Sequence, residues 1–226
     1  MKKERTLSKL TLRCVPAAVC ARRSVRVLQS TDDNREEKKM SKNVLICGVG
    51  GQGTVLAAKV LAQAAISGGE YVLSAETIGM AQRGGCVTSH VRIGQGIFSP
   101  LIPQGQADVL IAFEASEAVR NIKFLKQDGV VIVSRKVIQP ATASLTGKTF
   151  SEGEMISYLQ KNAGKVIDID TDSVCRSLQS SKVVNMVLLG AICKTGIVQK
   201  EQLKAALKLL VKPEFYELNV KAIETV

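Results

Sequence analysis

Residues 43–65 read NVLICGVGGQGTVLAAKVLAQAA, in which an apolar run, a glycine-rich turn and an alanine- and leucine-rich segment follow one another. The apolar run Val44–Cys47 predicts a short buried strand. The segment Thr54–Ala65 predicts a helix, because Ala and Leu are strong helix formers. Between them, Gly48–Gly53 fits the pattern G-x-G-x-x-G in the strand-to-helix context that gives the pattern its meaning. The order of these three parts predicts the first half of a β-α-β unit.

The glycine turn is a candidate anion site. Gly48 permits a tight turn, Gly50 permits a ligand to approach the backbone, and Gly53 lets the helix lie close to the sheet. Backbone amides at the helix start, with the positive end of the helix dipole behind them, suit a phosphate. The candidate residues are Gly48, Gly50, Gly51, Gln52 and Gly53. The alternative interpretation is a compact turn whose glycines bind nothing.

The remaining pattern predicts a single α/β domain over residues 40–226. Continuous apolar runs separated by helical segments are typical of a parallel sheet that is buried on both faces. Strands are expected at 70–75, 86–93, 109–113, 130–133 and 165–168, and helices at 117–126, 151–161, 182–194 and 203–210. Residues 182–194 are apolar almost all round, which predicts a buried helix. We therefore expect a Rossmann-like fold with a largely parallel sheet flanked by helices and a helical C-terminal part.

The charge of the chain is concentrated in its first residues. The whole chain carries 31 Lys and Arg against 20 Asp and Glu, a formal charge of +11, and residues 1–39 hold 11 of the basic and five of the acidic side chains. We expect residues 1–39 to be a basic, mobile tail, which is either a targeting segment or the result of a start site assigned too far upstream. The folded part then carries only +5, and with no Trp, five Phe and three Tyr it has little for a nucleic acid to stack on.

The cysteine and histidine content argues against a metal site and against disulfides. The six cysteines are scattered, no C-x-x-C occurs, and there is one histidine, so the ligand spacing of a zinc site or an iron–sulfur cluster is absent. A chain of this length does not need disulfide staples, and we expect a reducing, cytoplasmic environment. No apolar run reaches the roughly 20 residues of a membrane-spanning helix, so no membrane contact is expected.

A second candidate segment lies between two expected strands and reads ETIGMAQRGG over residues 76–85. Arg83 supplies a planar cation for a carboxylate or phosphate, and Gly84 and Gly85 allow backbone amides to converge on an anion. Gln82 and Glu76 would shape the same crevice at the carboxyl edge of the sheet. Glu76 is also the candidate for an acidic residue that holds the ribose of a dinucleotide, although it comes slightly late for that role. A solvated surface turn is the alternative.

Several motifs in order give the chain a resemblance to a known family. They are GVGGQG (48–53), GMAQRGG (79–85), SHVR (89–92), SPLIP (99–103), ADVL (107–110) and NMVLLGA (185–191). Together they resemble the small beta- or gamma-type subunit of the 2-oxoacid:ferredoxin oxidoreductases, and most closely the beta subunit of the indolepyruvate type. Ile78 stands where the indolepyruvate type often has histidine, which leaves the oxoacid open.

The resemblance implies a subunit of a two-subunit enzyme that oxidatively decarboxylates a 2-oxoacid to an acyl-CoA and reduces ferredoxin. It places thiamine diphosphate and the iron–sulfur clusters on the large partner subunit, which supply the carbon chemistry and the electron transfer. The small subunit would complete the site, would bind CoA or part of the substrate, and would be inactive alone.

Two competing interpretations of the whole chain stay open at this point. A self-sufficient NAD(P)-linked oxidoreductase could use the same glycine turn, and a basic nucleic-acid-binding module could use the charge. His90 has no visible catalytic partner, so a structural role is favoured over an acid–base role. Cys47 and Cys86 lack cationic neighbours other than Arg83, which favours packing over reactivity.

Overall fold

The computed structural model describes residues 41–77, 85–139 and 151–226. The basic tail expected at residues 1–39 lies outside the described residues, and so do three of the candidate site residues, Gln82, Arg83 and Gly84. No helix within the described ranges is long and apolar enough to cross a membrane.

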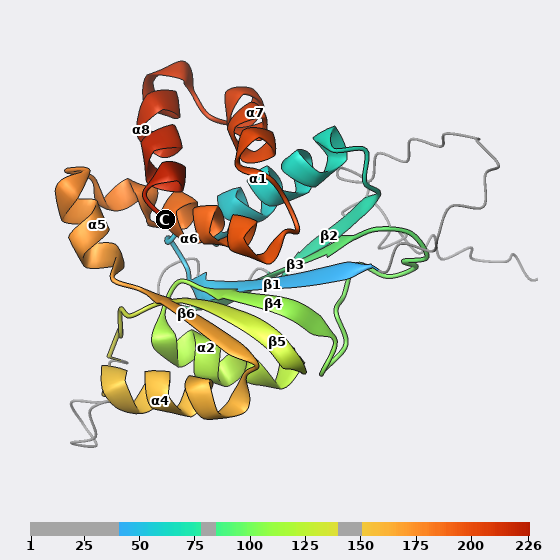
Figure 1. Ribbon diagram of the computed structural model, residues 1–226, viewed down its shortest axis with the longest axis vertical. Helices are drawn as coiled ribbons and strands as arrows, with labels where there is room; N and C mark the ends of the chain where they lie inside the picture. The colour runs from blue at the N-terminus through green and yellow to red at the C-terminus, as the bar shows by residue number, and fades with distance from the viewer. Residues whose placement is uncertain (1–40, 78–84, 140–150) are drawn as a thin grey trace, which may run out of the picture. The chain divides into compact units, whose positions relative to one another are not determined.

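The described chain forms a six-stranded sheet in the order β2-β3-β1-β4-β5-β6 (Figure 1). The strands are β1 (Lys42–Val49), β2 (Val72–Thr77), β3 (Cys86–Ile93), β4 (Ala107–Ala112), β5 (Leu125–Ser134) and β6 (Lys165–Ile169). Three of the five neighbouring pairs are parallel, and β3 runs antiparallel to both β1 and β2. Only residues 78–85 join β2 to β3, which is too short for the crossover that a parallel pair needs.

Helices cover both faces of this sheet. They are α1 (Thr54–Ser67), α2 (Ala115–Asn121), α4 (Glu152–Asn162), α5 (Thr171–Ser177), α6 (Val184–Ala191), α7 (Lys200–Leu210) and α8 (Pro213–Glu224), with short 3-10 turns η2 (Ile122–Phe124), η3 (Ser181–Val183) and η4 (Ile192–Thr195). The expected α/β fold with a helical C-terminal part is therefore confirmed. The helix expected at 117–126 begins earlier and ends earlier, because residues from Leu125 onward join β5.

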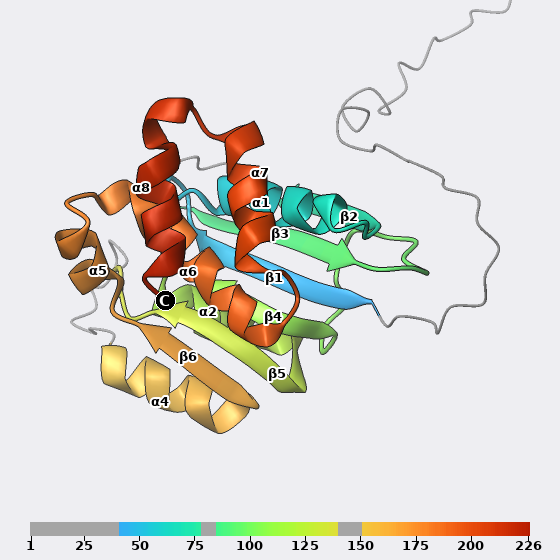
Figure 2. The ribbon, with the colours of Figure 1, turned by 45° about the horizontal axis from the view of Figure 1, so that its top comes forward.

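Two hydrophobic cores follow from the two-residue period of β1. Val44 and Ile46 face the core built with α1, α6, α7 and α8, whereas Leu45 and Cys47 face the core built with α2 and α4. Figure 2 shows α7 and α8 lying outside α1 and α6 on the first face. Seven of the eight residues of α6 are buried, which confirms the buried helix expected at 182–194.

Candidate functional site

The glycine turn lies where the winding of the sheet reverses. The chain leaves β1 through α1 on one face and reaches β2, whereas it leaves β4 through α2 on the other face and reaches β5. β1 and β4 are neighbours and parallel, so both strands end at the same edge of the sheet. The connections that follow them leave toward opposite faces. Such a switch point is where open α/β sheets bind their ligands. The candidate site is therefore the crevice after β1 and β4.

Side-chain and backbone contacts hold the glycine turn in place. The Val49 amide donates to Gln52 Oε1 at 2.8 Å, and the Gln52 amide donates to the Val49 carbonyl at 3.2 Å. A Cβ on the buried Gly48 would lie 2.9 Å from Phe113 Cβ and 2.9 Å from Thr54 Cγ2, so only glycine fits there. The side-chain oxygen of Gln52, Oε1, thus has a structural role inside the turn, and the side-chain nitrogen Nε2 is the part left for a ligand.

The start of α1 has the features of an anion site. Gly53, the residue before the helix, has a φ of 84° and gives no side-chain cap, and no acidic residue stands in the first turn. The first intrahelical bond runs from the Ala57 amide to the Gly53 carbonyl at 3.0 Å. The amides of Thr54, Val55 and Leu56 therefore have no acceptor within the helix. With the helix dipole behind them, these three donors favour a negatively charged group.

Two of the candidate residues of the second segment, Glu76 and Gly85, are described by the structure, and Gly85 contacts the glycine turn. The Gly50 amide donates to the Gly85 carbonyl at 2.8 Å, which joins the turn to the residue before β3. Glu76 is paired with Ser89 of β3, and Ser89 is paired with Ile46 of β1. At about 4.8 Å between strands, the Glu76 backbone lies about 10 Å from β1.

This position of Glu76 weakens the dinucleotide interpretation. The acidic residue of a Rossmann site follows a strand next to the first one. Here the antiparallel β3 lies between β1 and β2. Glu76 is thus displaced by one strand from the position that a ribose would require.

The opposite wall of the crevice is acidic and was missed by the sequence analysis. Glu114 lies two residues after the end of β4 and is only 1% exposed. Its carboxylate accepts hydrogen bonds from the Ser116 hydroxyl at 2.5 Å, the Glu117 amide at 3.2 Å and the Ile138 amide at 2.8 Å. Glu114 therefore caps α2. Glutamate is not among the usual capping residues Ser, Thr, Asp and Asn, so no cap was expected here and the predicted helix began at Glu117.

Glu117 extends this acidic wall toward two thiols. It is 4% exposed, and its Oε1 accepts from Arg120 Nε at 3.1 Å, while Oε2 has no donor among the described residues. Burial, and then the charge of Glu117, raise the pKa of Cys47. Burial, and then the neighbouring carboxylate of Glu117, raise the pKa of Cys86 to about 11. Both thiols stay protonated at neutral pH, which agrees with the expected low reactivity of these cysteines. Cys47 is buried in a hydrophobic core, whereas Cys86 is exposed, so the expected packing role holds for Cys47 and not for Cys86.

His90 has the structural role that the sequence favoured. Its Nδ1 accepts a hydrogen bond from the Ile102 amide at 3.1 Å, and its ring packs edge-on against Phe124 with 6.0 Å between centroids. Burial lowers the pKa of the imidazole. His90 is therefore a neutral acceptor that fixes the segment between β3 and β4.

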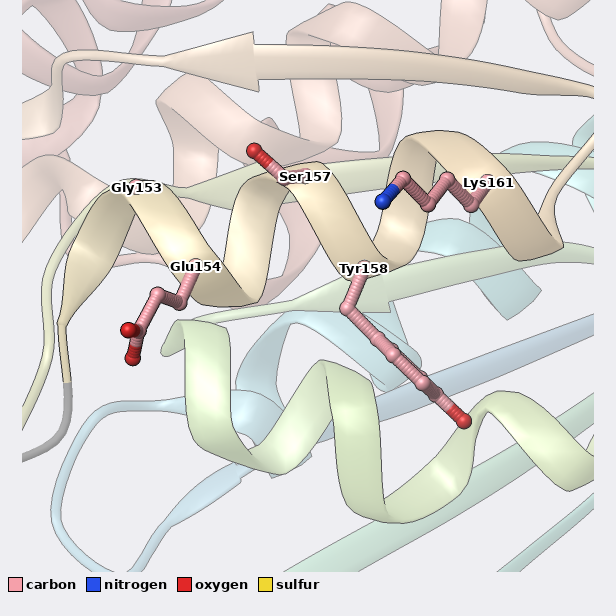
Figure 3. A pocket seen from close by; sticks show the side chains of 5 residues that line it. All are labelled: Gly153, Glu154, Ser157, Tyr158 and Lys161. Carbon is pink, nitrogen blue, oxygen red and sulfur yellow. The ribbon is translucent and has the colours of Figure 1, made fainter.

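A pocket on α4 is a weaker candidate. Among the described residues it is lined by Gly153, Glu154, Ser157, Tyr158 and Lys161 (Figure 3). Glu154 and Tyr158 extend to one side of the helix, and Ser157 and Lys161 to the other. All five come from one helix and are exposed, so no groups from separate elements converge there.

The fold defines a doubly wound α/β protein, with a candidate anion site at its switch point. Comparison with known sequences then gives the family. The pyruvate ferredoxin/flavodoxin oxidoreductase family matches residues 43–226, and the chain belongs to this family. A protein of Archaeoglobus fulgidus named indolepyruvate oxidoreductase subunit IorB is 38% identical over 191 residues, which cover 82% of this chain and 93% of that protein.

Solved structures agree with this assignment. The gamma subunit of a keto/oxoacid ferredoxin oxidoreductase from Geobacter sulfurreducens is 27% identical, with a TM-score of 0.60 over 81% of this chain and 94% of that one. The 2-oxoglutarate:ferredoxin oxidoreductase from Magnetococcus marinus, solved with 2-oxoglutarate, coenzyme A and succinyl-CoA, is 20% identical with a TM-score of 0.63. The match covers 84% of this chain but 30% of that longer chain, where the same fold is one part of a larger polypeptide.

Proposed function

We propose that this chain is the small subunit of a thiamine-dependent 2-oxoacid:ferredoxin oxidoreductase of the indolepyruvate or arylpyruvate type. Such an enzyme converts a 2-oxoacid and CoA to an acyl-CoA and CO2 and passes two electrons to ferredoxin. The observation that carries the proposal is the extent of the similarity to the Archaeoglobus fulgidus subunit, which the chain matches over 93% of that subunit's length. The chain thus corresponds to nearly the whole of one subunit of an oxidoreductase.

The partner in this proposal is a large subunit that holds thiamine diphosphate and iron–sulfur clusters. These groups supply the electron sink for decarboxylation and the one-electron carriers. The present chain completes the active site and is inactive alone, and the complex is a cytoplasmic heteromer that binds neither nucleic acid nor membrane.

The crevice after β1 supports a ligand-binding role within that complex. The free amides of Thr54, Val55 and Leu56 would receive a phosphate of CoA or the carboxylate of the oxoacid. Gly50 and Gly85 hold the rim of the crevice together through their hydrogen bond. Arg83, with Gln82 and Gly84, belongs to the segment that joins β2 to β3, and we propose that it adds a cation to the same anion site.

Co-expression with the large subunit tests the proposal. The complex, purified without oxygen, is expected to reduce ferredoxin when given indolepyruvate and CoA, whereas each subunit alone is expected to be inactive. Turnover of NADH by the isolated chain, or failure of the two subunits to associate, would contradict the proposal.

An Arg83→Ala variant tests the role of the segment at 78–85. It is expected to raise the Michaelis constant for CoA or for indolepyruvate in the assembled complex. Arg176→Ala is the matched control, because Arg176 is an exposed arginine on α5 whose guanidinium donates to the Ser173 hydroxyl on the same helix. Equal kinetics of both variants and the wild type would remove Arg83 from the site.

A further inference from the structure

The segment that joins β3 to β4, residues 94–106, is the strongest feature that the proposed site does not use. It contains no Asp, Glu, Lys, Arg or His. Phe98 is 97% exposed and Leu101 is 52% exposed, whereas Ile97 and Ile102 are 5% and 2% exposed. The β3–β4 segment thus buries two of its apolar side chains and turns two outward. Exposed apolar side chains on a segment without charge are typical of a binding surface.

Side chains of β3 hold this segment in one conformation. Arg92 Nη1 donates to the Ser99 carbonyl at 2.9 Å. His90 Nδ1 accepts from the Ile102 amide at 3.1 Å. These bonds fix residues next to both exposed apolar side chains, so little conformational entropy is left to lose when a partner binds.

The β3–β4 segment lies at the end of the sheet opposite the crevice. β3 runs antiparallel to β1, and its last residue, Ile93, is paired with Lys42 at the start of β1 (Figure 1). The glycine turn follows the other end of β1. This strand has eight residues, which places the turn about 24 Å from the segment. A partner bound to the segment therefore leaves the crevice free.

We infer that the β3–β4 segment is a docking surface for the large subunit, which receives the Phe98 ring and the Leu101 side chain in an uncharged apolar pocket. The inference rests on the proposed function for the identity of that subunit. Interface centres are depleted of charged residues and enriched in aromatic ones, and a few anchor residues there contribute most of the binding energy. An ordered segment with an exposed aromatic ring at its tip has the chemistry of such an anchor.

The available apolar area argues against a second copy of this chain as the occupant. Two copies that met only through Phe98 and Leu101 would bury about 600 Å² of side-chain surface in total, taking the area of one aromatic and half an aliphatic side chain from each copy. A stable interface buries roughly 1,200 Å² or more. A large subunit can surround the segment and add contacts on either side of it.

Photo-crosslinking in the assembled complex tests the inference. The full-length chain carries p-benzoylphenylalanine in place of Phe98 and is co-expressed with the large subunit. Leu209, which is 69% exposed on α7, is the matched control position. Position 98 is expected to crosslink to the large subunit well above the level seen from position 209. No excess over position 209, or a crosslink from position 98 to a second copy or to residues 1–40 of the same chain, would overturn the inference.

Substitution measures what the aromatic ring contributes to association. Surface plasmon resonance is expected to show that Phe98→Ala binds the large subunit about 30-fold or more weakly than the wild type, as loss of an interface anchor implies, and that Phe98→Tyr retains most of the affinity. Leu209→Ala is expected to bind as the wild type does. The melting temperature of the isolated chain should not change in Phe98→Ala, because the side chain is almost fully exposed.

Steady-state kinetics separate docking from a role in the crevice. At saturating Phe98→Ala chain, kcat and KM for the oxoacid are expected to return to the wild-type values, because the crevice lies at the other end of β1. An active complex in which Phe98→Ala binds as tightly as the wild type would refute the docking role and leave the proposed function standing. Association through Phe98 without turnover of any oxoacid would keep the docking surface and contradict the proposed function.

Discussion

Replacement of Gly53 by alanine probes the geometry at the start of α1 most directly. Gly53 has a φ of 84°, and alanine in this left-handed region costs about 1–2 kcal/mol. The new Cβ would also lie 2.9 Å from Asn185 Nδ2, so the Asn185 side chain must move from its rotamer at a further cost of about 1 kcal/mol. Gly53→Ala is therefore expected to lower the free energy of unfolding by about 2–3 kcal/mol, the sum of these two costs.

Gly51→Ala is the control for the first of these two costs. Gly51 also has a positive φ, 97°, but a Cβ there would meet no heavy atom within 4 Å. Its loss should thus be the backbone part alone, about 1–2 kcal/mol. Urea unfolding of the full-length chain measures both variants, and at this chain length each 1 kcal/mol also lowers the melting temperature by about 2–4 °C.

A double-mutant cycle assigns the difference to Asn185. In the Asn185→Ala background, the extra cost of Gly53→Ala over Gly51→Ala is expected to disappear, because the side chain that the new Cβ meets is gone. Equal destabilisation by the two glycine substitutions, or an excess that persists without Asn185, would refute the placement of Asn185 beside the turn.

Three further predictions concern the acidic wall and the histidine. Glu114→Ala is expected to cost about 1–2 kcal/mol of unfolding free energy through loss of the α2 cap, measured by urea unfolding, with Glu114→Gln less affected because it keeps an acceptor. The pKa of His90 is lowered in the folded chain, so near and below pH 6.5 the unfolded chain binds more protons than the folded chain. The free energy of unfolding is therefore expected to fall as the pH drops below about 6.5. Unfolding curves of His90→Gln, measured between pH 5 and 8, should lose this dependence. The pKa of Cys86 near 11 predicts slow alkylation by iodoacetamide at pH 8 despite its exposure, and Glu117→Gln should speed the reaction severalfold; a Cys86 as reactive as glutathione would show that Glu117 does not act on it.

Features that depend on residues close together along the chain could be predicted from the sequence alone. The apolar run of β1, the glycine turn and α1 follow one another within a single β-α-β half, and each is encoded by local propensity. The buried helix α6 was predictable for the same reason, because an apolar surface on all sides excludes an exposed position. The direction of β3 could also have been inferred, since the short connection after β2 excludes a parallel crossover.

The features that escaped prediction depend on contacts across the fold. Asn185 lies in an apolar run, where its pattern marks it as core, and only the packing of α6 against α1 brings it to Gly53. Glu76 was expected to shape the same crevice as the glycine turn, because it comes at the end of the next strand along the chain. The insertion of β3 between β1 and β2 moved it away by one strand. Strand order is a tertiary property that no local period encodes.

The two walls of the crevice have opposite electrostatic preferences, and this constrains what the site can hold. The start of α1 offers unpaired donors, whereas Glu114 and Glu117 place buried carboxylates at the start of α2. Glu114 already accepts three hydrogen bonds, so its charge is compensated within α2. Among the residues that the structure describes, Glu117 Oε2 receives no hydrogen bond, and an unpaired buried carboxylate oxygen is costly. The donors at the start of α1 therefore favour one anionic group, and the carboxylates at the start of α2 disfavour a second one.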